Sequence, residues 1–200
     1  MSGDKKYILD LVESKKYTGT FVEIGTWTGD FAEALLKSTQ CKTLVCVDPY
    51  KFFNDFSYRD SMNLKLHADA EKRFVSAKTR LEKVGNRRVQ MLRKLSMDAV
   101  PDFEDASLDF VYIDGNHEYK YALEDILAWY PKIKPGGILA GDDIWSTRLE
   151  EYENNNMLVK FGGAEFSWGV FGVYPAVLEA ERVLGIQITI QGTQFYSVKT

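Results

Sequence analysis

The residues best suited to chemistry lie where two short apolar runs end in acidic side chains. Residues 109–113 form a largely apolar run typical of a buried strand, and Asp114 follows it directly. His117 lies three residues further on. A second apolar run ends in Asp142 and Asp143. Ligands of open α/β sheets bind where strands end, so a carboxylate and an imidazole there suit a metal ligand and a general base. The alternative is a turn aspartate beside a solvated histidine.

The three carboxylates of Asp114, Asp142 and Asp143 would converge if the two strands are neighbours. Close carboxylates raise one another's pKa, and a divalent cation removes that repulsion. Oxygen ligands favour Mg²⁺, Mn²⁺ or Ca²⁺ over Zn²⁺, and we expect Mg²⁺, or else Mn²⁺. His117, with a reference pKa near ~6.5, would then take a proton from the substrate hydroxyl. The alternative for either member of the Asp142–Asp143 pair is to cap the helix that follows.

A glycine loop, Gly25–Gly29, follows a predicted strand at residues 20–24. A dinucleotide fingerprint would need glycine at the position of Trp27, and Glu23 would repel a diphosphate. Asp48 ends the second predicted strand, close to the ~20-residue distance expected of a ribose-binding acid. S-adenosylmethionine fits these features because it carries positive charge and a ribose but no phosphate. The alternative is a pair of turn glycines and an aspartate at a strand end.

Strands and helices alternate along the chain, which favours a parallel sheet. We expect one α/β domain over residues 1–200, with a Rossmann-like, mostly parallel seven-stranded sheet, helices on both faces and a C-terminal antiparallel hairpin. The aromatic segment 50–60 is expected to be a loop or lid, and residues 146–166 a surface insertion. The predicted strands are 20–24, 43–47, 88–92, 109–113, 138–140, 186–190 and 194–198; the predicted helices are 4–17, 30–38, 62–84, 96–100, 119–130 and about 175–184, with a turn at 134–137.

Composition excludes several classes of protein. The formal net charge of −4 gives no global basic surface for nucleic acid, although four basic residues lie between positions 87 and 94. Cys41 and Cys46 fit neither a disulfide framework nor a zinc site and are expected to be packing residues. The first residues lack the apolar core of a signal peptide, and no apolar run is long enough to cross a bilayer. A cytoplasmic protein is therefore expected.

At these residues the chain resembles a class I S-adenosylmethionine-dependent methyltransferase, over nearly its whole length. Residues 23–29 resemble the first motif of that family, and residues 95–98 resemble the loop whose serine and next residue face the adenine. Residues 108–115 and the Lys-Pro-Gly-Gly turn at 134–137 resemble later motifs. The resemblance implies that the cofactor is bound by Glu23, Gly25, Thr26, Trp27, Gly29, Asp48, Ser96, Met97 and Asp114.

The chain is more narrowly similar to metal-dependent O-methyltransferases. Catechol and caffeoyl-CoA types carry Asp-Asn at the end of strand five, whereas this chain has Asp142–Asp143. The spacing from Asp114 to His117 is similar to the macrolide-sugar branch, in which that histidine is the proposed base; catechol types carry lysine there. This resemblance implies methylation of a sugar hydroxyl, for example of a deoxyhexose such as rhamnose, in a glycan or glycosylated metabolite.

Other functions stay open at this point. A catechol-like acceptor and a non-catalytic nucleotide-binding module are the main alternatives, and an NAD-dependent oxidoreductase is opposed by Trp27. The expected partner is a small-molecule or glycan acceptor, without nucleic acid or membrane. A homodimer is left open.

Overall fold

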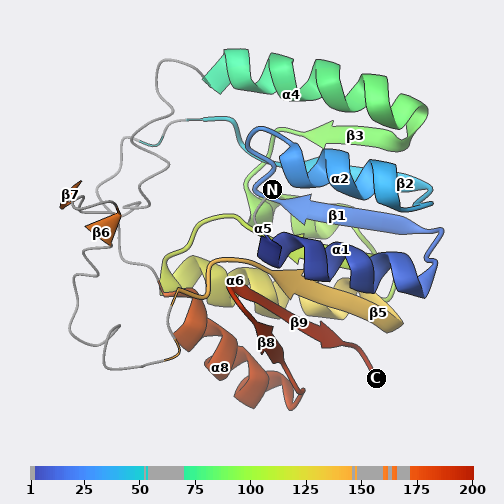
Figure 1. Cartoon of the computed structure of the whole chain (residues 1–200). Coiled ribbons are helices and arrows are strands. Elements are labelled where there is room, and N and C mark those ends of the chain that lie inside the picture. The colour runs from blue at the N-terminus through green and yellow to red at the C-terminus, as the bar shows by residue number, and fades with distance from the viewer. Residues whose placement is uncertain are drawn as a thin grey trace.

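Seven strands form one mixed sheet in the order β3-β2-β1-β4-β5-β9-β8 (Figure 1). The first five are parallel, and β9 runs antiparallel between β5 and β8. The predicted sheet and its C-terminal hairpin are therefore confirmed. The computed structural model describes residues 3–51, 53, 70–145, 147, 160–161, 164–165 and 172–200. The strands of the sheet are β1 (Thr20–Ile24), β2 (Thr43–Val47), β3 (Val89–Leu92), β4 (Leu108–Ile113), β5 (Ile133–Gly141), β8 (Thr189–Gln191) and β9 (Gln194–Val198); β6 (Lys160–Phe161) and β7 (Ala164–Glu165) pair separately.

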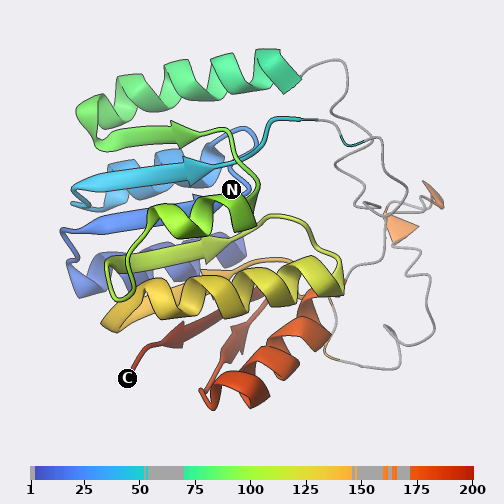
Figure 2. The same cartoon turned by 180° about the vertical axis from the view of Figure 1, so that it is seen from behind.

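Helices cover both faces of the sheet (Figures 1 and 2). One group packs on the face that carries Phe21 and Phe110, and the other on the face that carries Val22 and Val111. No helix among the described residues is long and apolar enough to cross a membrane. The first group is α1 (Gly3–Lys15), α2 (Asp30–Ser38) and α4 (Ala70–Gly85); the second is α5 (Ser96–Ala99), α6 (Tyr119–Trp129) and α8 (Val173–Leu184), with short 3-10 turns at Asn86–Arg88, Val100–Asp102 and Tyr130–Lys132.

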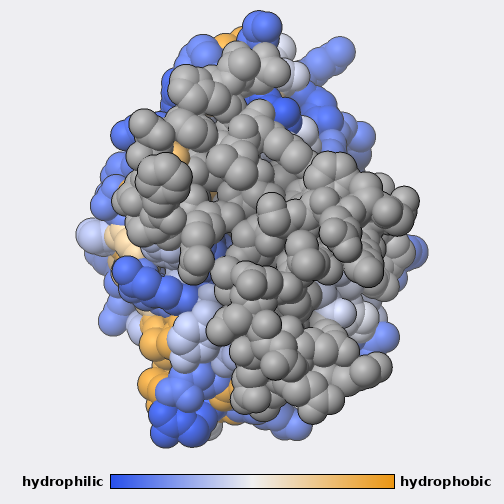
Figure 3. All heavy atoms as spheres, turned by 90° about the vertical axis from the view of Figure 1, so that its left-hand side faces the viewer, coloured by the Kyte–Doolittle hydropathy of each residue, from blue (hydrophilic) through white to orange (hydrophobic). Residues whose placement is uncertain are grey.

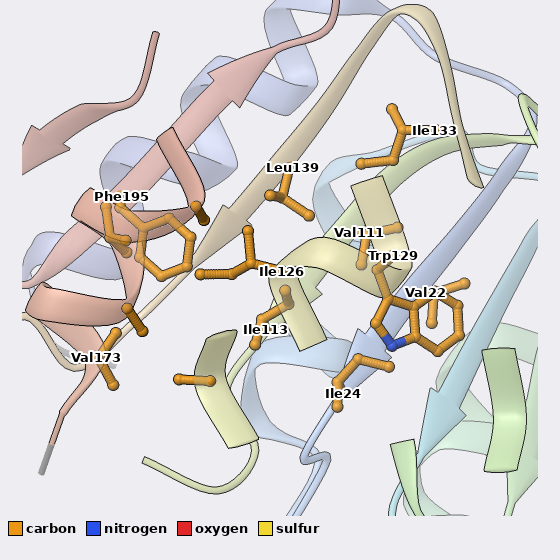
Figure 4. Packing of buried hydrophobic residues seen from close by; sticks show 14 of the residues in the cluster. Val22, Ile24, Val111, Ile113, Ile126, Trp129, Ile133, Leu139, Val173 and Phe195 are labelled. Atoms are coloured by element: carbon orange, nitrogen blue, oxygen red, sulfur yellow. The ribbon is translucent and has the colours of Figure 1, made fainter. Parts of the chain in front are cut away.

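The parallel strands are apolar on both sides because helices bury both of their faces. In β1, Val22 and Ile24 face α6 and the elements beside it, while Phe21 faces α1 and α2. Figure 4 shows the cluster on the face of Val22 and Val111, in which the fully buried Trp129 is the largest side chain. Burying an aliphatic side chain such as Val22 or Ile24 stabilises the fold by about 1.5–3 kcal/mol. The backbone register between β1, β4 and β5 brings the carboxyl ends of these strands to the same edge of the sheet.

Several predicted boundaries differ from the structure. Residues 134–137 are not a separate turn, because β5 begins at Ile133 and the Gly136 N–H donates to Lys199 O at 2.7 Å, so backbone pairing continues. Helix α8 begins at Val173, two residues before the proline expected to open it. The second-last strand is Thr189–Gln191, shorter than predicted. The expected lid at 50–60 and insertion at 146–166 lie largely outside the described residues.

Candidate active site

The strand ends place the predicted site residues in one row. The backbone N–H groups of Gly25, Asp114 and Asp142 each donate to the last carbonyl of a neighbouring strand, at 2.8, 2.9 and 3.1 Å. These three residues therefore lie side by side across β1, β4 and β5. This carboxyl end of the parallel strands is where α/β sheets bind ligands. Figure 3 looks at that side, and most described atoms in view belong to hydrophilic residues.

His117 lies between two of the predicted carboxylates. Its Nε2 atom is 2.6 Å from Asp143 Oδ2 and 3.6 Å from Asp114 Oδ1. One potential ligand atom from each of these three residues lies within 4.8 Å of the other two. Asp143 adopts the left-handed backbone conformation, with φ of 70°, which a non-glycine residue adopts at some cost. The predicted convergence of strand ends thus brings together Asp114, His117 and Asp143.

Asp142 is held in a different way from Asp143. Its Oδ1 atom accepts hydrogen bonds from the Asp143 N–H at 2.8 Å, from the Thr193 hydroxyl at 2.8 Å and from Gln194 Nε2. Its Oδ2 atom pairs with Lys5 Nζ at 3.0 Å. Asp142 is predicted from the sequence as a metal ligand, but in the structure its carboxylate is occupied by these four contacts.

Lys5 is the residue of this site that sequence reasoning missed. It reaches from α1 to Asp114 Oδ2 at 2.7 Å as well as to Asp142. Burial alone would lower the pKa of the Lys5 ammonium, but the two carboxylates raise it above its ordinary value. A local signal existed: Lys5 precedes Ile8, Leu9 and Val12 by three, four and seven residues and so shares the buried stripe of an amphipathic helix.

The contacts give the two carboxylates next to Lys5 opposite pKa shifts. Burial pushes the pKa of Asp114 upward, but the contacts with His117 and Lys5 outweigh it and hold the pKa at about 2. Burial and the neighbouring charge of Asp114 raise the pKa of Asp142, and Lys5 opposes this. Asp114 is therefore ionised at any pH where the protein would work.

The glycine loop packs directly against Asp114. Gly25 has φ of +83°, and a Cβ atom there would lie 1.9 Å from the Asp114 carbonyl oxygen. Gly29 also has positive φ, and its Cβ would approach Leu81 to 2.9 Å. Trp27 has φ of 50° with a full side chain. Glycine at position 25 thus lets the predicted cofactor loop pack directly beside the carboxylate cluster.

Asp48 ties the glycine loop to the end of β2. Its Oδ2 accepts the Trp27 N–H at 2.9 Å, and its Oδ1 accepts the Tyr50 N–H at 2.7 Å. The Tyr50 hydroxyl donates back to the Trp27 carbonyl at 2.9 Å. Burial raises the pKa of Asp48, and these backbone donors lower it. Each carboxylate oxygen can accept a further hydrogen bond, so this arrangement is compatible with a ribose diol.

Glu23 and Thr26 lie beneath the loop. Both are buried, and Glu23 Oε2 and Thr26 Oγ1 have no hydrogen-bond partner among the described residues. Burial raises the pKa of Glu23 to about 8. An interaction with the nearby Thr26 hydroxyl lowers the pKa of Glu23 but does not outweigh burial.

The predicted adenine-facing pair divides between two environments. Ser96 opens α5, and its hydroxyl accepts the Trp129 Nε1–H at 2.8 Å, so it is anchored to the core. Met97 is exposed. Asp125 of α6 lies close by, is 4% exposed, and burial raises its pKa to about 7. The structure thus leaves the Met97 side chain, but not all of Ser96, available at the surface.

Comparisons with known proteins agree with this geometry. A family model described as a methyltransferase domain matches residues 22–144. The chain is 23% identical over 166 residues to the protein R132 of Acanthamoeba polyphaga mimivirus, covering 78% of this chain and 68% of that protein. The O-methyltransferase TomG of Streptomyces achromogenes, involved in tomaymycin synthesis and solved in complex with SAM, is 14% identical with a TM-score of 0.62; the match covers 100% of this chain and 81% of that one. The O-methyltransferase NovP is 16% identical with a TM-score of 0.66, over 98% and 79%.

Proposed function

Because the chain belongs to the family of methyltransferase domains, we propose that it transfers the methyl group of S-adenosylmethionine to a hydroxyl of a sugar or similar diol, with a divalent cation held by Asp114 and Asp143. The observation that carries the proposal is the convergence of Asp114, His117 and Asp143 beside the glycine loop. TomG and NovP are O-methyltransferases, which supports oxygen as the methyl acceptor. The sugar class rests on the resemblance of the Asp114–His117 spacing. A homodimer stays a prediction.

The charges of the site fit a divalent cation. Asp114, Asp142 and Asp143 bring three negative charges, and Lys5 brings one positive charge, which leaves two negative charges. Mg²⁺ is commonly held by one or two carboxylates together with water and substrate, and Mn²⁺ accepts similar ligands. When bound, such an ion would lower the pKa of a hydroxyl that it coordinates.

The chain's own residues would orient the reactants and accept the proton. Asp48 and the glycine loop would hold the cofactor at the end of β1, directly beside Asp114. His117 lies against the carboxylates of Asp114 and Asp143, where its imidazole could accept the hydroxyl proton as a general base. Asp143 would then stabilise the resulting imidazolium by an ion pair. Holding the two reactants in line lowers the activation free energy, by about 7–11 kcal/mol in favourable cases.

His117 has a second conceivable role, as a third ligand of the cation, because its Nε2 lies within the same 4.8 Å set. One nitrogen cannot bind a cation and accept a proton at once. The two roles differ in the effect of His117→Ala on Mn²⁺ affinity, which falls strongly for a ligand and little for a base. We expect the second result, together with a kcat at least about 100-fold lower.

The test is transfer of a labelled methyl group to a panel of free sugars, glycosides and catechols, with Mg²⁺, Mn²⁺ or EDTA. We expect metal-dependent transfer to a sugar diol, lost in Asp114→Asn and Asp143→Asn. Asp105→Asn is the matched control, since Asp105 is exposed and pairs with Lys132 at 2.7 Å. EDTA-insensitive turnover would remove the cation from the proposal, and transfer to catechols alone would replace the acceptor class.

A further inference from the structure

Lys5 brings a positive charge from the first described helix into the centre of the site. Its ammonium lies between Asp114 Oδ2 at 2.7 Å and Asp142 Oδ2 at 3.0 Å. It also lies 5.8 Å from the Phe31 ring centre and 5.6 Å from that of Tyr112, on the apolar face beneath. Its side chain is 22% exposed, so water screens these contacts only in part. Figure 1 shows α1 beginning at the edge where β1 ends.

Asp142, one of the two partners of Lys5, is held in place by a buried hydrogen-bond network on the side away from Lys5. The Tyr112 hydroxyl donates to Gln194 Oε1 at 2.8 Å, and the amide of Gln194 donates in turn to Asp142 Oδ1. Gln194 is fully buried, and Thr193 adds a second side-chain donor at 2.8 Å. With Oδ1 accepting three hydrogen bonds, Asp142 can direct only Oδ2 into the site, and Lys5 occupies that oxygen.

Asp114 separates two halves of the site. Its Oδ1 faces His117 at 3.6 Å, on the side of Asp143, while its Oδ2 faces Lys5, on the side of Asp142. The side with Asp143 is the one on which three potential ligand atoms converge. The side with Asp142 already holds a cation, the ammonium.

We propose that Lys5 is a built-in counter-ion that withholds Asp142 from the divalent cation and leaves Asp114 and Asp143 as its carboxylate ligands. The proposal rests on the metal site of the proposed function and adds to it the residue that sets its charge. The ammonium cancels one of the three negative charges and opposes a nearby divalent cation. Removing it would both end that repulsion and free Asp142 Oδ2 to coordinate.

The experiment compares Mn²⁺ binding by the full chain and its Lys5→Met variant, using electron paramagnetic resonance of free Mn²⁺. When one carboxylate separates a unit charge from a divalent ion, that charge changes the affinity for the ion by about tenfold or more, even in a water-like dielectric. We therefore expect Lys5→Met to bind Mn²⁺ at least about tenfold more tightly. Lys6→Met is the matched control, because Lys6 lies next along α1 but pairs with Asp10 at the surface, and its affinity should equal that of the wild type.

The double variant identifies the source of the gain. Asp142→Asn in the Lys5→Met background should remove most of the added affinity. Asp142→Asn alone should weaken Mn²⁺ binding by about tenfold, the effect of one charge that does not touch the ion, whereas Asp143→Asn should abolish it. If Lys5→Met does not fold, this last comparison decides the question, since abolished binding in Asp142→Asn would make Asp142 a ligand and overturn the proposal.

The outcomes separate this proposal from the one on which it rests. Wild-type binding with equal or weaker binding by Lys5→Met would overturn the role of Lys5 and leave the metal site standing. A residue with a merely structural role would weaken binding when replaced, so a tighter Kd is specific to a counter-ion. Binding by neither protein would overturn both proposals.

Discussion

Replacing Gly25 by alanine tests the packing of the cofactor loop against the carboxylate cluster. The new Cβ would lie 1.9 Å from the Asp114 carbonyl oxygen, whereas ordinary contact begins at 3.4 Å, so this backbone must shift by about 1.5 Å. Such overpacking costs about 1–3 kcal/mol, and alanine at positive φ costs about 1–2 kcal/mol more. Reduced freedom of the unfolded chain returns about 0.4–1 kcal/mol. We expect the free energy of unfolding to fall by about 1–4.5 kcal/mol, the sum of these contributions.

Gly185→Ala is the matched control for this change. Gly185 has φ of +63°, and no atom lies within 4 Å of the place that an added methyl group would take, so its replacement carries the backbone strain without the clash. We expect it to cost about 1 kcal/mol. Equilibrium urea unfolding followed by circular dichroism measures both variants. In Gly25→Ala, methyl transfer should also fall about 100-fold, because an ångström-scale displacement of a catalytic group has that effect. Equal destabilisation of the two variants would refute the close packing of Gly25 on Asp114.

Three further changes test other parts of the structure. The pKa of Asp125 is about 7 in the fold and about 3.9 unfolded, so the folded state holds a proton that the unfolded state has lost, and the free energy of unfolding falls as pH rises from about 4 to about 7. Asp125→Asn should remove this decrease and be more stable than the wild type at pH 8 by about 2–4 kcal/mol. Urea unfolding of both proteins at pH 5 and at pH 8 measures this, and a pH dependence of the variant equal to that of the wild type would contradict it. Trp129→Phe loses the hydrogen bond to Ser96 and some core volume, and should cost about 1–3 kcal/mol in the same assay, with no loss contradicting the anchoring of α5. Arg88→Met removes a guanidinium that donates to the carbonyls of four residues near the end of α2 and of α4. We expect the free energy of unfolding to fall by about 1–3 kcal/mol and Tm to fall by several degrees. An unchanged melting curve would show that water satisfies these carbonyls equally well in the variant.

Much of the fold follows from local patterns in the sequence. Short apolar runs predicted the strands, three of which are followed closely by aspartate, and their alternation with amphipathic segments predicted the parallel sheet. Because parallel strands end at one edge, Asp114 and Asp143 could be expected to meet. One boundary error falls where tertiary pairing overrides a local signal: the predicted glycine turn at Gly136 is part of β5, because the Gly136 N–H donates to the Lys199 carbonyl.

The site was harder to predict because its contacts are far apart along the chain. Lys5 and Asp114 are separated by 109 positions, and no spacing rule links them. The pair Asp142 and Asp143 looks equivalent in sequence, but the Thr193 and Gln194 side chains bind only Asp142. Which of two adjacent aspartates faces a ligand depends on such packing, and the sequence pattern holds no information about it.

The dependence of Asp142 on β9 has a consequence for how the protein matures. Residues near positions 5, 114, 142 and 194 must all be in place before the charges of the site are balanced. A chain in which the β8–β9 hairpin has not yet docked therefore exposes an acidic pocket, in which Asp142 lacks its side-chain donors. Docking of this hairpin should therefore be the folding step that fixes the direction of the Asp142 carboxylate and, with it, the charge balance of the site.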